Sequence, residues 1–190
     1  MTARKKVIQG GTSAGKTYAI LAVLIHIAAK AKTEISVVSE SIPHLRRGAM
    51  KDFGKVMQWT NRWRDEGWNK TLLTYTFANG STIEFFSADQ EAKLRGARRQ
   101  VLYINEANNI EFEAYHQLAI RTSEAIYIDF NPVSEFWAHT EVLAEQDSEL
   151  IVLTYSDNEA LPATIRDDIE AAQVKAATST YWANWWKVYG

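Results

Sequence analysis

An eight-residue stretch near the amino terminus, GGTSAGKT (Gly10–Thr17), limits what this chain can fold into more than any other feature. It matches the pattern G-x-x-x-x-G-K-[ST] at every fixed position. A short β-branched run, KKVIQ, precedes it, and a long apolar stretch, GKTYAILAVLIHIAAKA, follows it. This order predicts a strand, a tight glycine turn and a helix that is apolar nearly all round and therefore buried.

The chemistry of phosphate binding explains the spacing within this stretch. Glycines let the backbone curl so that successive N–H groups point at phosphate oxygens, and the positive end of the helix dipole faces the anion. Lys16 supplies a point charge for the β- and γ-phosphates, and Thr17 offers a hydroxyl to Mg²⁺. We therefore predict a site for ATP and Mg²⁺ whose residues are Gly10, Gly11, Thr12, Ser13, Ala14, Gly15, Lys16 and Thr17.

The stretch VLYINEANNI places polar side chains directly after an apolar strand. In P-loop ATPases, a strand beside the loop strand ends in an acid that holds the Mg²⁺ shell, and a following Glu activates the attacking water. Glu106 fits the general-base role. Asn105 takes the metal position, where its amide oxygen can accept a hydrogen bond but adds no charge. The other interpretation is that this run only caps the next helix, which we expect of Asn108 and Asn109.

The rest of the chain alternates strand-like and helix-like segments. Strands are expected at EISVVSE, VLYIN, AIYIDF and LIVLTYS, and helices at residues 43–67, EFEAYHQLAI, FWAHTEVLAE, residues 162–176 and STYWANWWKVY. Two alternating runs around Asn79-Gly80 predict a hairpin with a positive φ at its turn. The prediction is an α/β fold of the P-loop NTPase type, with a mainly parallel central sheet, helices on both faces and an antiparallel hairpin.

Length, net charge and residue content limit the classes of protein to which this chain can belong. The 190 residues fit one domain, and a net charge of −2 means that contact with nucleic acid needs a local basic patch. Arg46, Arg47 and Lys51 are one candidate, although charged helix faces are usually only solvated. The chain has no cysteine, and its four histidines lack metal-ligand spacing. No segment approaches the roughly 20 apolar residues that span a bilayer, so we expect no membrane contact.

Four runs together make the sequence resemble the large terminase subunits of tailed bacteriophages, and within them the branch found in PBSX-type defective prophages. The runs are VIQGGTSAGKTYAI, KLRGARRQVLYINEAN, IDFNPVSEFW and TYSDNEALP. They occur in the order and spacing of that family and extend over essentially the whole chain. The phosphate loop alone would indicate only an NTPase, whereas YINEAN followed by DFNP makes the resemblance specific.

The resemblance implies an additional-strand ATPase domain (residues 1–190) that hydrolyses ATP to drive double-stranded viral DNA into a procapsid. Such a motor works with the small terminase subunit at the procapsid portal, in the cytoplasm of the bacterial host. It would form a homo-oligomeric ring, a pentamer by family resemblance, whereas the isolated domain would be largely monomeric. The family's nuclease domain is expected to be absent, because no cluster of acids follows the terminal aromatics. We expect those aromatics to pack on the domain's own core; they are Tyr181, Trp182, Trp185 and Trp186.

The resemblance also assigns roles to particular residues. Gln9 leads into the loop near the nucleotide. The run DFNP (Asp129–Pro132) lies where the family has the motif that couples the γ-phosphate state to domain movement, and Asn131 is our choice for the sensing side chain. Some terminases have an arginine within the phosphate loop, where this chain has Thr12 and Ser13, so a charge-stabilising arginine must come from elsewhere.

The run KLRGARRQ supplies the candidate for that arginine. A phosphoryl transition state spreads negative charge, which an arginine from a neighbouring subunit can stabilise. Arg95 is preferred, with Arg98 and Arg99 behind it. A solvated basic loop that pairs with surface acids is the other interpretation, and both stay open.

Other classes of protein share the phosphate loop. A helicase-like nucleic-acid translocase should show a second motor domain, which this sequence lacks. A small-molecule kinase needs a lid with arginines, but residues 110–160 hold only Arg121. A nucleotide-binding module with weak hydrolysis is the further alternative if Asn105 disables turnover.

Overall fold

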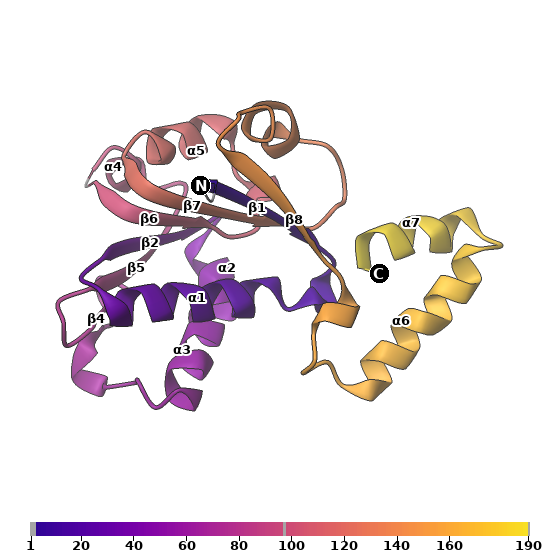
Figure 1. Cartoon of the computed structure of the whole chain (residues 1–190), viewed down its shortest axis with the longest axis horizontal. Helices are drawn as coiled ribbons and strands as arrows, with labels where there is room; N and C mark the ends of the chain where they lie inside the picture. Colours follow the sequence, from indigo (N-terminus) through magenta and orange to yellow (C-terminus); the bar gives the residue numbers. More distant parts are fainter. Residues whose placement is uncertain (1–2, 97, 190) are drawn as a thin grey trace.

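The computed structural model describes residues 3–96 and 98–189, and it contains one eight-stranded sheet with helices on both faces (Figure 1). The strand order is β3-β4-β5-β2-β6-β7-β1-β8. The strands are β1 (Lys5–Gly10), β2 (Glu34–Ser39), β3 (Trp68–Asn69), β4 (Thr74–Thr76), β5 (Thr82–Ser87), β6 (Arg99–Ile104), β7 (Thr122–Phe130) and β8 (Ser148–Leu153). Pairing is parallel except where β4 meets β3 and β5, so the predicted parallel sheet and hairpin are confirmed.

The position of β7 agrees with the additional-strand fold that the family resemblance implies. It differs from the simpler P-loop arrangement, in which the strand leading into Asn105 would lie directly beside the loop strand β1. β7 lies between β1 and β6, with Ile8 opposite Asp129 and Ile104 opposite Ile128. This additional strand brings the carboxyl ends of β1, β7 and β6 side by side at one edge, where ligands bind in open α/β sheets.

The helices form a layer on each face of the sheet. The helices are α1 (Lys16–Lys30), α2 (Ile42–Arg47), α3 (Ala49–Trp59), α4 (Glu91–Leu94), α5 (Phe112–Ala119), α6 (Ala163–Ala176) and α7 (Thr180–Tyr189). Short 3₁₀ segments are η1 (Thr12–Ala14), η2 (Asp65–Gly67), η3 (Ala107–Asn109) and η5 (Tyr155–Asp157), and η4 (Ala138–Val142) is π-helical. One core joins α1, α2, α3 and the hairpin, and the other joins α5 and η4.

The helix predicted over residues 43–67 is two shorter helices. Ser41 begins the first by accepting a hydrogen bond from the backbone N–H of His44, 3.4 Å away. Gly48 separates α2 from α3, which ends at Trp59. The chain then turns instead of continuing, because Asn61 adopts a left-handed conformation with φ 55°.

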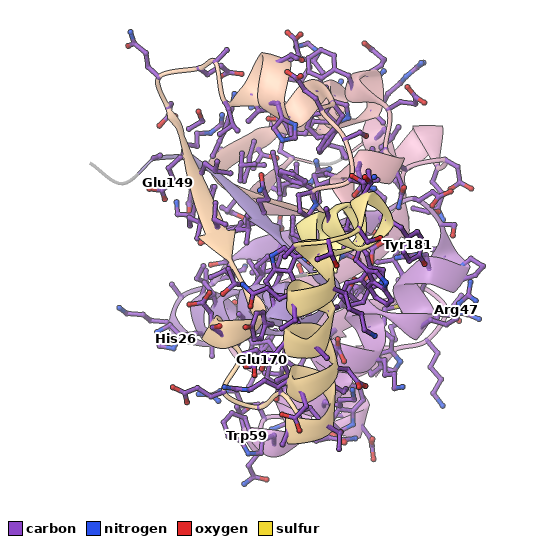
Figure 2. All side chains as sticks on the ribbon, turned by 90° about the vertical axis from the view of Figure 1, so that its right-hand side faces the viewer. His26, Arg47, Trp59, Glu149, Glu170 and Tyr181 are labelled. Atoms are coloured by element: carbon purple, nitrogen blue, oxygen red, sulfur yellow. The ribbon has the colours of Figure 1, made fainter. Side chains whose placement is uncertain are left out.

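An aromatic cluster anchors α3 against the hairpin. Phe53 is 1% exposed, and its ring lies 5.2–6.5 Å from four other rings. These rings belong to Trp63, Trp68, Tyr75 and Phe85. Trp59, four residues before Trp63, is 79% exposed at the edge of the molecule (Figure 2). The turn after α3 carries Trp63 inward and leaves Trp59 on the outer face.

Helix α1 is buried on one side only. Leu21 and Leu24 are fully buried against the sheet, whereas Val23 is 45% exposed. The prediction of a helix buried all round is therefore wrong. By length and composition, the helical stretch Thr12–Lys30 is long and apolar enough to cross a membrane, contrary to our expectation. The core helix of a soluble protein passes the same test, and in this fold Leu21 and Leu24 pack on the sheet.

The last two helices form a hairpin that stands beside the sheet, beyond the end of β8 (Figure 1). Their contacts are mainly with each other. Trp186 contacts Tyr155 of η5, and Trp182 packs on Trp185. Tyr181 is 70% exposed. The terminal aromatics thus form their own small cluster and do not join either main core, which corrects the expected packing.

Candidate nucleotide site

The phosphate loop is a tight turn between β1 and α1 that depends on two glycines. It runs from Gly10 at the end of β1 through η1 to the first residue of α1. Gly15 has φ 72°, a conformation that side chains other than glycine rarely adopt. A Cβ on Gly10 would lie 2.3 Å from the carbonyl oxygen of Leu153 in β8. The two glycines are therefore required by the turn and by strand packing, and they leave the N–H groups of the first turn of α1 facing the cleft.

Lys16 is held inside the loop. Its ammonium donates hydrogen bonds to the carbonyl oxygens of Gly10 and Gly11, at 2.7 and 3.0 Å, and to Oδ1 of Asn131, at 2.9 Å. Burial lowers the pKa of Lys16, and the charges of Asp129 and Glu106 oppose that shift. The structure thus brings two predicted site residues, Lys16 and Asn131, into direct contact.

A buried hydrogen-bond network surrounds Asn105, which is 2% exposed. Its amide nitrogen lies 3.1 Å from Oδ1 of Asp129, 3.2 Å from the hydroxyl of Tyr103 and 3.4 Å from Oγ1 of Thr17. The same Asp129 oxygen accepts hydrogen bonds from the Tyr103 hydroxyl and from the backbone N–H of Glu106, both at 3.0 Å. Asn105 and Thr17, the two predicted metal residues, are therefore adjacent.

Asp129 supplies the negative charge that Asn105 lacks. It is 1% exposed, and burial raises its pKa against the opposing effects of Lys16 and its hydrogen-bond donors. Because β7 lies beside β6, this carboxylate reaches the position where the expected acid is missing. The family resemblance assigns the run that contains Asp129 only to coupling. A single acid in the apolar strand AIYIDF was the available signal.

Glu106 has a strained backbone and a defined side-chain partner. Its φ and ψ are 55° and 57°, a left-handed conformation that is uncommon for this residue type and is often found at functional sites. Oε2 of Glu106 lies 3.1 Å from Nε2 of His44. Asn108 and Asn109 do not cap the next helix, since Glu111 precedes α5 without a side-chain cap. That alternative interpretation of the polar run is wrong.

Two adjoining hollows surround the loop. A polar cleft of about 150 Å³ is bordered by Thr12, Gly15, Lys16, Thr17, Tyr18, Asp52, Glu106, Asp129 and Asn131. A more apolar cavity of about 400 Å³ is bordered by Ala14, Gly15, Tyr18, Ala19, Leu153, Asp157, Asn158, Ala160, Leu161 and Pro162. Gly15 and Tyr18 border both hollows. The amide of Asn158 also donates to the carbonyl oxygen of Ser13 at 2.8 Å and so supports the loop from the side.

Other predicted residues lie farther from this cleft. Gln9 is half-buried within β1, opposite Phe130 and Val152. Arg99 is 5% exposed, and its guanidinium donates to the carbonyl oxygen of Leu118 at 3.3 Å, so it serves the fold and not a neighbouring subunit.

The basic loop that carries Arg95 lies at the opposite edge of the sheet from the phosphate loop. Gly96 and Arg98 border a hollow together with Glu34 and Thr82, the first residues of β2 and β5. Ala97, within this loop, lies outside the described residues. The loop is therefore remote from Lys16 of its own chain, and a role for Arg95 requires a second subunit.

Comparisons with known proteins identify the family and the fold of this chain. Residues 2–185 match the family described as phage terminase large subunit. No curated protein matches the sequence.

Solved structures have the same fold at low sequence identity. A large terminase from a thermophilic bacteriophage has a TM-score of 0.78 at 14% identity, over 98% of this chain and 47% of that one. The ATPase domain of the large terminase of Thermus phage P74-26 has a TM-score of 0.64 at 14% identity, and the match covers 99% of this chain and 88% of that one. The Phi-29 viral genome packaging motor assembly has a TM-score of 0.62 at 12% identity, and the match covers 99% of this chain and 64% of that one. This chain thus spans about half the length of the first of these proteins.

Proposed function

Because the chain belongs to the phage terminase large subunit family, we propose that its 190 residues form the ATP-hydrolysing motor domain of a viral DNA-packaging machine. One observation carries the proposal. Lys16, Glu106, Asp129 and Asn131 come from three separate segments and border one cleft at the carboxyl edge of the sheet. This set combines a phosphate-binding cation, a general base, a buried acid and an amide that contacts the cation, which together suit nucleotide hydrolysis.

Phosphate binding would replace contacts that the loop now makes with itself. The ammonium of Lys16 is occupied by two loop carbonyls and by Asn131. In the proposed function, phosphate oxygens take the place of these acceptors, because an anion satisfies a buried ammonium better than neutral carbonyls do. Asn131 then loses or keeps its contact with Lys16 according to whether the γ-phosphate is present, which makes it the proposed sensor.

Thr17 and Asp129 would hold Mg²⁺, directly or through water, and Asn105 would orient both, because its amide nitrogen donates to Asp129 and lies 3.4 Å from Oγ1 of Thr17. The donor set fits a hard cation, since hydroxyl and carboxylate oxygens are ligands that Mg²⁺ prefers. The bound ion would neutralise charge on the β- and γ-phosphates. Asp129 borders the cleft and is buried, so its charge is weakly screened there. This supports a role for Asp129 in place of an acid at residue 105.

Glu106 is the proposed general base. Its side chain is 36% exposed, and the residue borders the cleft that also holds Lys16. A carboxylate there can accept a proton from water that attacks the γ-phosphate.

The apolar cavity beside Tyr18 is the proposed site of the adenine base. The nucleotide would extend from the loop past Gly15 and Tyr18, the two residues that border both hollows. The large terminase from the thermophilic bacteriophage has been solved in complex with ADP and with ATP-gamma-S. Those complexes support a nucleotide of this type as the ligand here.

The proposed partners follow from the family. They are double-stranded viral DNA, the small terminase subunit and the portal of the procapsid, in the cytoplasm of an infected bacterium. The domain would act in a homo-oligomeric ring, a pentamer by the resemblance, and would be largely monomeric alone. The runs YINEAN and DFNP support placement in the PBSX-type branch.

The decisive experiment is ATP turnover over a wide range of protein concentration, with Glu106→Gln as the control. We expect turnover per subunit to rise steeply with concentration and to vanish in the variant, because an isolated subunit lacks its neighbour's arginine. Concentration-independent turnover would place the whole site in one chain. Tight ATP binding without turnover at any concentration would favour a nucleotide-binding module, in which Asn105 disables hydrolysis.

A further inference from the structure

A fully buried tyrosine lies beneath the proposed metal position. Tyr103 is on β6, two residues before Asn105, and it is 0% exposed. Its hydroxyl donates to Oδ1 of Asp129 at 3.0 Å and lies 3.2 Å from the amide nitrogen of Asn105. Alternate residues of a strand point to the same face of a sheet. β6 therefore directs two polar side chains at one carboxylate on β7.

The hydroxyl of Tyr103 is the part of this residue that packing does not require. The ring belongs to the core that α1, α2 and α3 share, and a phenylalanine ring would fill the same volume. A buried hydroxyl costs free energy unless it finds hydrogen-bond partners. Here both of its partners, Asp129 and Asn105, belong to the proposed site. The polar group of Tyr103 thus serves the site, whereas its ring serves the core.

The two oxygens of the Asp129 carboxylate have different surroundings. Oδ1 accepts hydrogen bonds from the Tyr103 hydroxyl, from the amide of Asn105 and from the backbone N–H of Glu106, at 3.0 to 3.1 Å. Within residues 3–96 and 98–189, no hydrogen bond to Oδ2 is found. Asp129 also borders the polar cleft. The three donors therefore leave Oδ2 as the oxygen that is available to a ligand in the cleft.

A carboxylate that holds a metal ion needs such support. The last torsion of an aspartate side chain is soft and roughly two-fold, so its two oxygens can exchange places. Hydrogen bonds from groups that do not touch the ion fix the orientation of the ligand. Tyr103 suits this task, because its donor is a neutral hydroxyl on a rigid ring that the core holds in place.

We propose that Tyr103 is a positioning residue for the Mg²⁺ site, whose hydroxyl acts with the amide of Asn105 to hold Oδ1 of Asp129 and so present Oδ2 to the cation. The inference rests on the proposed function, since it takes Asp129 as a residue that holds Mg²⁺. It gives β6 the task of orienting the metal carboxylate instead of supplying one. An amide at residue 105 suits that task, because an amide can donate to a carboxylate and a second carboxylate cannot.

The variant Tyr103→Phe tests the inference, because it removes the hydroxyl and keeps the ring. The probe is Mn²⁺ in the presence of ADP, titrated against the full chain and followed by the electron paramagnetic resonance signal of the free ion. The affinity for Mn²⁺ should fall about tenfold, since loss of a group that orients a metal ligand has an effect of this size. The affinity for ADP without metal should change by less than about twofold, because the hydroxyl is remote from the phosphates.

Turnover gives a second measurement that a purely structural role would not affect. In Tyr103→Phe, the Mg²⁺ concentration that gives half-maximal ATP hydrolysis should rise about tenfold. Excess Mg²⁺ should then restore kcat to within about twofold of the parent value, because the defect lies in metal binding and not in the reacting groups.

Tyr75→Phe is the matched control. Tyr75 is 1% exposed, and its hydroxyl donates to the carbonyl oxygen of Arg62 and accepts from the backbone N–H of Arg64, both at 3.0 Å. It lies on β4, three strands from β6 in the sheet. Its substitution also removes a buried hydroxyl with two hydrogen bonds, so it should lower the melting temperature and leave Mn²⁺ binding unchanged.

Three outcomes would overturn the inference. They are an unchanged Mn²⁺ affinity in folded Tyr103→Phe, an equal loss of affinity in Tyr75→Phe, and a loss of metal-free ADP binding as large as the loss of Mn²⁺ binding.

The parent chain and Glu106→Gln separate this inference from the proposed function. A parent chain that does not bind Mn²⁺ with ADP would refute the metal site and the role of Tyr103 together. Turnover that survives Glu106→Gln would refute the proposed general base, whatever Tyr103→Phe does. If the parent binds Mn²⁺ and Glu106→Gln abolishes turnover, an unchanged Mn²⁺ affinity in Tyr103→Phe refutes only the role of Tyr103.

Discussion

At the scale of single residues, Asn105 and Asp129 together occupy the place where one acid is expected at the end of β6. An amide replaces the expected acid at the end of β6, and a carboxylate one strand away accepts its hydrogen bond at 3.1 Å. Burial raises the pKa of Asp129, so keeping this group ionised costs folding free energy. A costly buried charge at a cleft is typical of a functional group.

The variant Asp129→Asn tests whether this buried charge lowers the free energy of unfolding while it supports binding of Mg²⁺ and ATP. The pKa of Asp129 is higher in the folded protein than in the unfolded chain. The free energy of unfolding therefore decreases as pH rises from the unfolded-state pKa to the folded-state pKa. Above the folded-state pKa, the full destabilisation by the ionised carboxylate is present. At neutral pH we expect Asp129→Asn to raise the free energy of unfolding by about 1 kcal/mol and to abolish stabilisation by Mg²⁺ and ATP. Thermal melting with and without Mg²⁺ and ATP measures both effects.

Asp52→Asn is the matched control for that variant. Asp52 borders the same cleft but pairs with Lys55. Its loss should leave stabilisation by Mg²⁺ and ATP nearly unchanged. Equal effects of the two substitutions would show that Asp129 has no special part in metal binding.

At the scale of elements, side-chain periodicity predicted the strands better than the helices. β1, β2, β6, β7 and β8 all overlap the predicted runs, because buried parallel strands are continuous apolar segments, although β6, β7 and β8 begin before their runs. The helix predicted over residues 43–67 breaks at Gly48 and ends at Trp59. The segment FWAHTEVLAE contains only a short π-helical turn. Helix ends depend on tertiary contacts that periodicity does not contain.

The aromatic cluster on α3 provides a test at this scale. Phe53 is 1% exposed among four rings, whereas Trp59 on the same helix is 79% exposed. Phe53→Ala should lower the free energy of unfolding by about 3–4 kcal/mol, because it leaves a cavity between α3 and the hairpin. Trp59→Ala should change it by less than about 0.5 kcal/mol. Urea denaturation compares them, and a larger loss in Trp59→Ala would contradict the assigned packing.

At the scale of the whole molecule, the nucleotide cleft and the basic loop lie at opposite edges of the sheet. The carboxyl edge holds the cleft, and the amino edge holds the basic loop of Arg95 and Arg98. No single subunit can bring these edges together, since they are opposite ends of the same strands. The geometry therefore suits a ring in which the edge of one subunit faces the cleft of the next.

The variant Arg95→Ala tests this arrangement in the assembled motor. We expect DNA-stimulated turnover to fall by about a thousandfold, because the transition state loses a stabilising cation. Turnover of dilute protein should not change. Arg98→Ala, in the same loop, is the matched control and should retain most activity. Intact turnover of the assembled Arg95→Ala motor would leave this loop as an ordinary solvated surface.

Local spacing and apolar periodicity predict the phosphate loop, the mainly parallel sheet, the hairpin and Glu106 as a candidate base, because a chain carries these patterns wherever it folds. Asn131 and the additional strand are implied only by the resemblance to the terminase family. The three-dimensional structure was needed to identify β7 as the strand between β1 and β6, to place Asp129 beside Asn105 and to bring His44 to Glu106. Strand order is set by how whole elements pack, so contacts between residues 24 and 62 positions apart in the chain cannot be derived from local pattern.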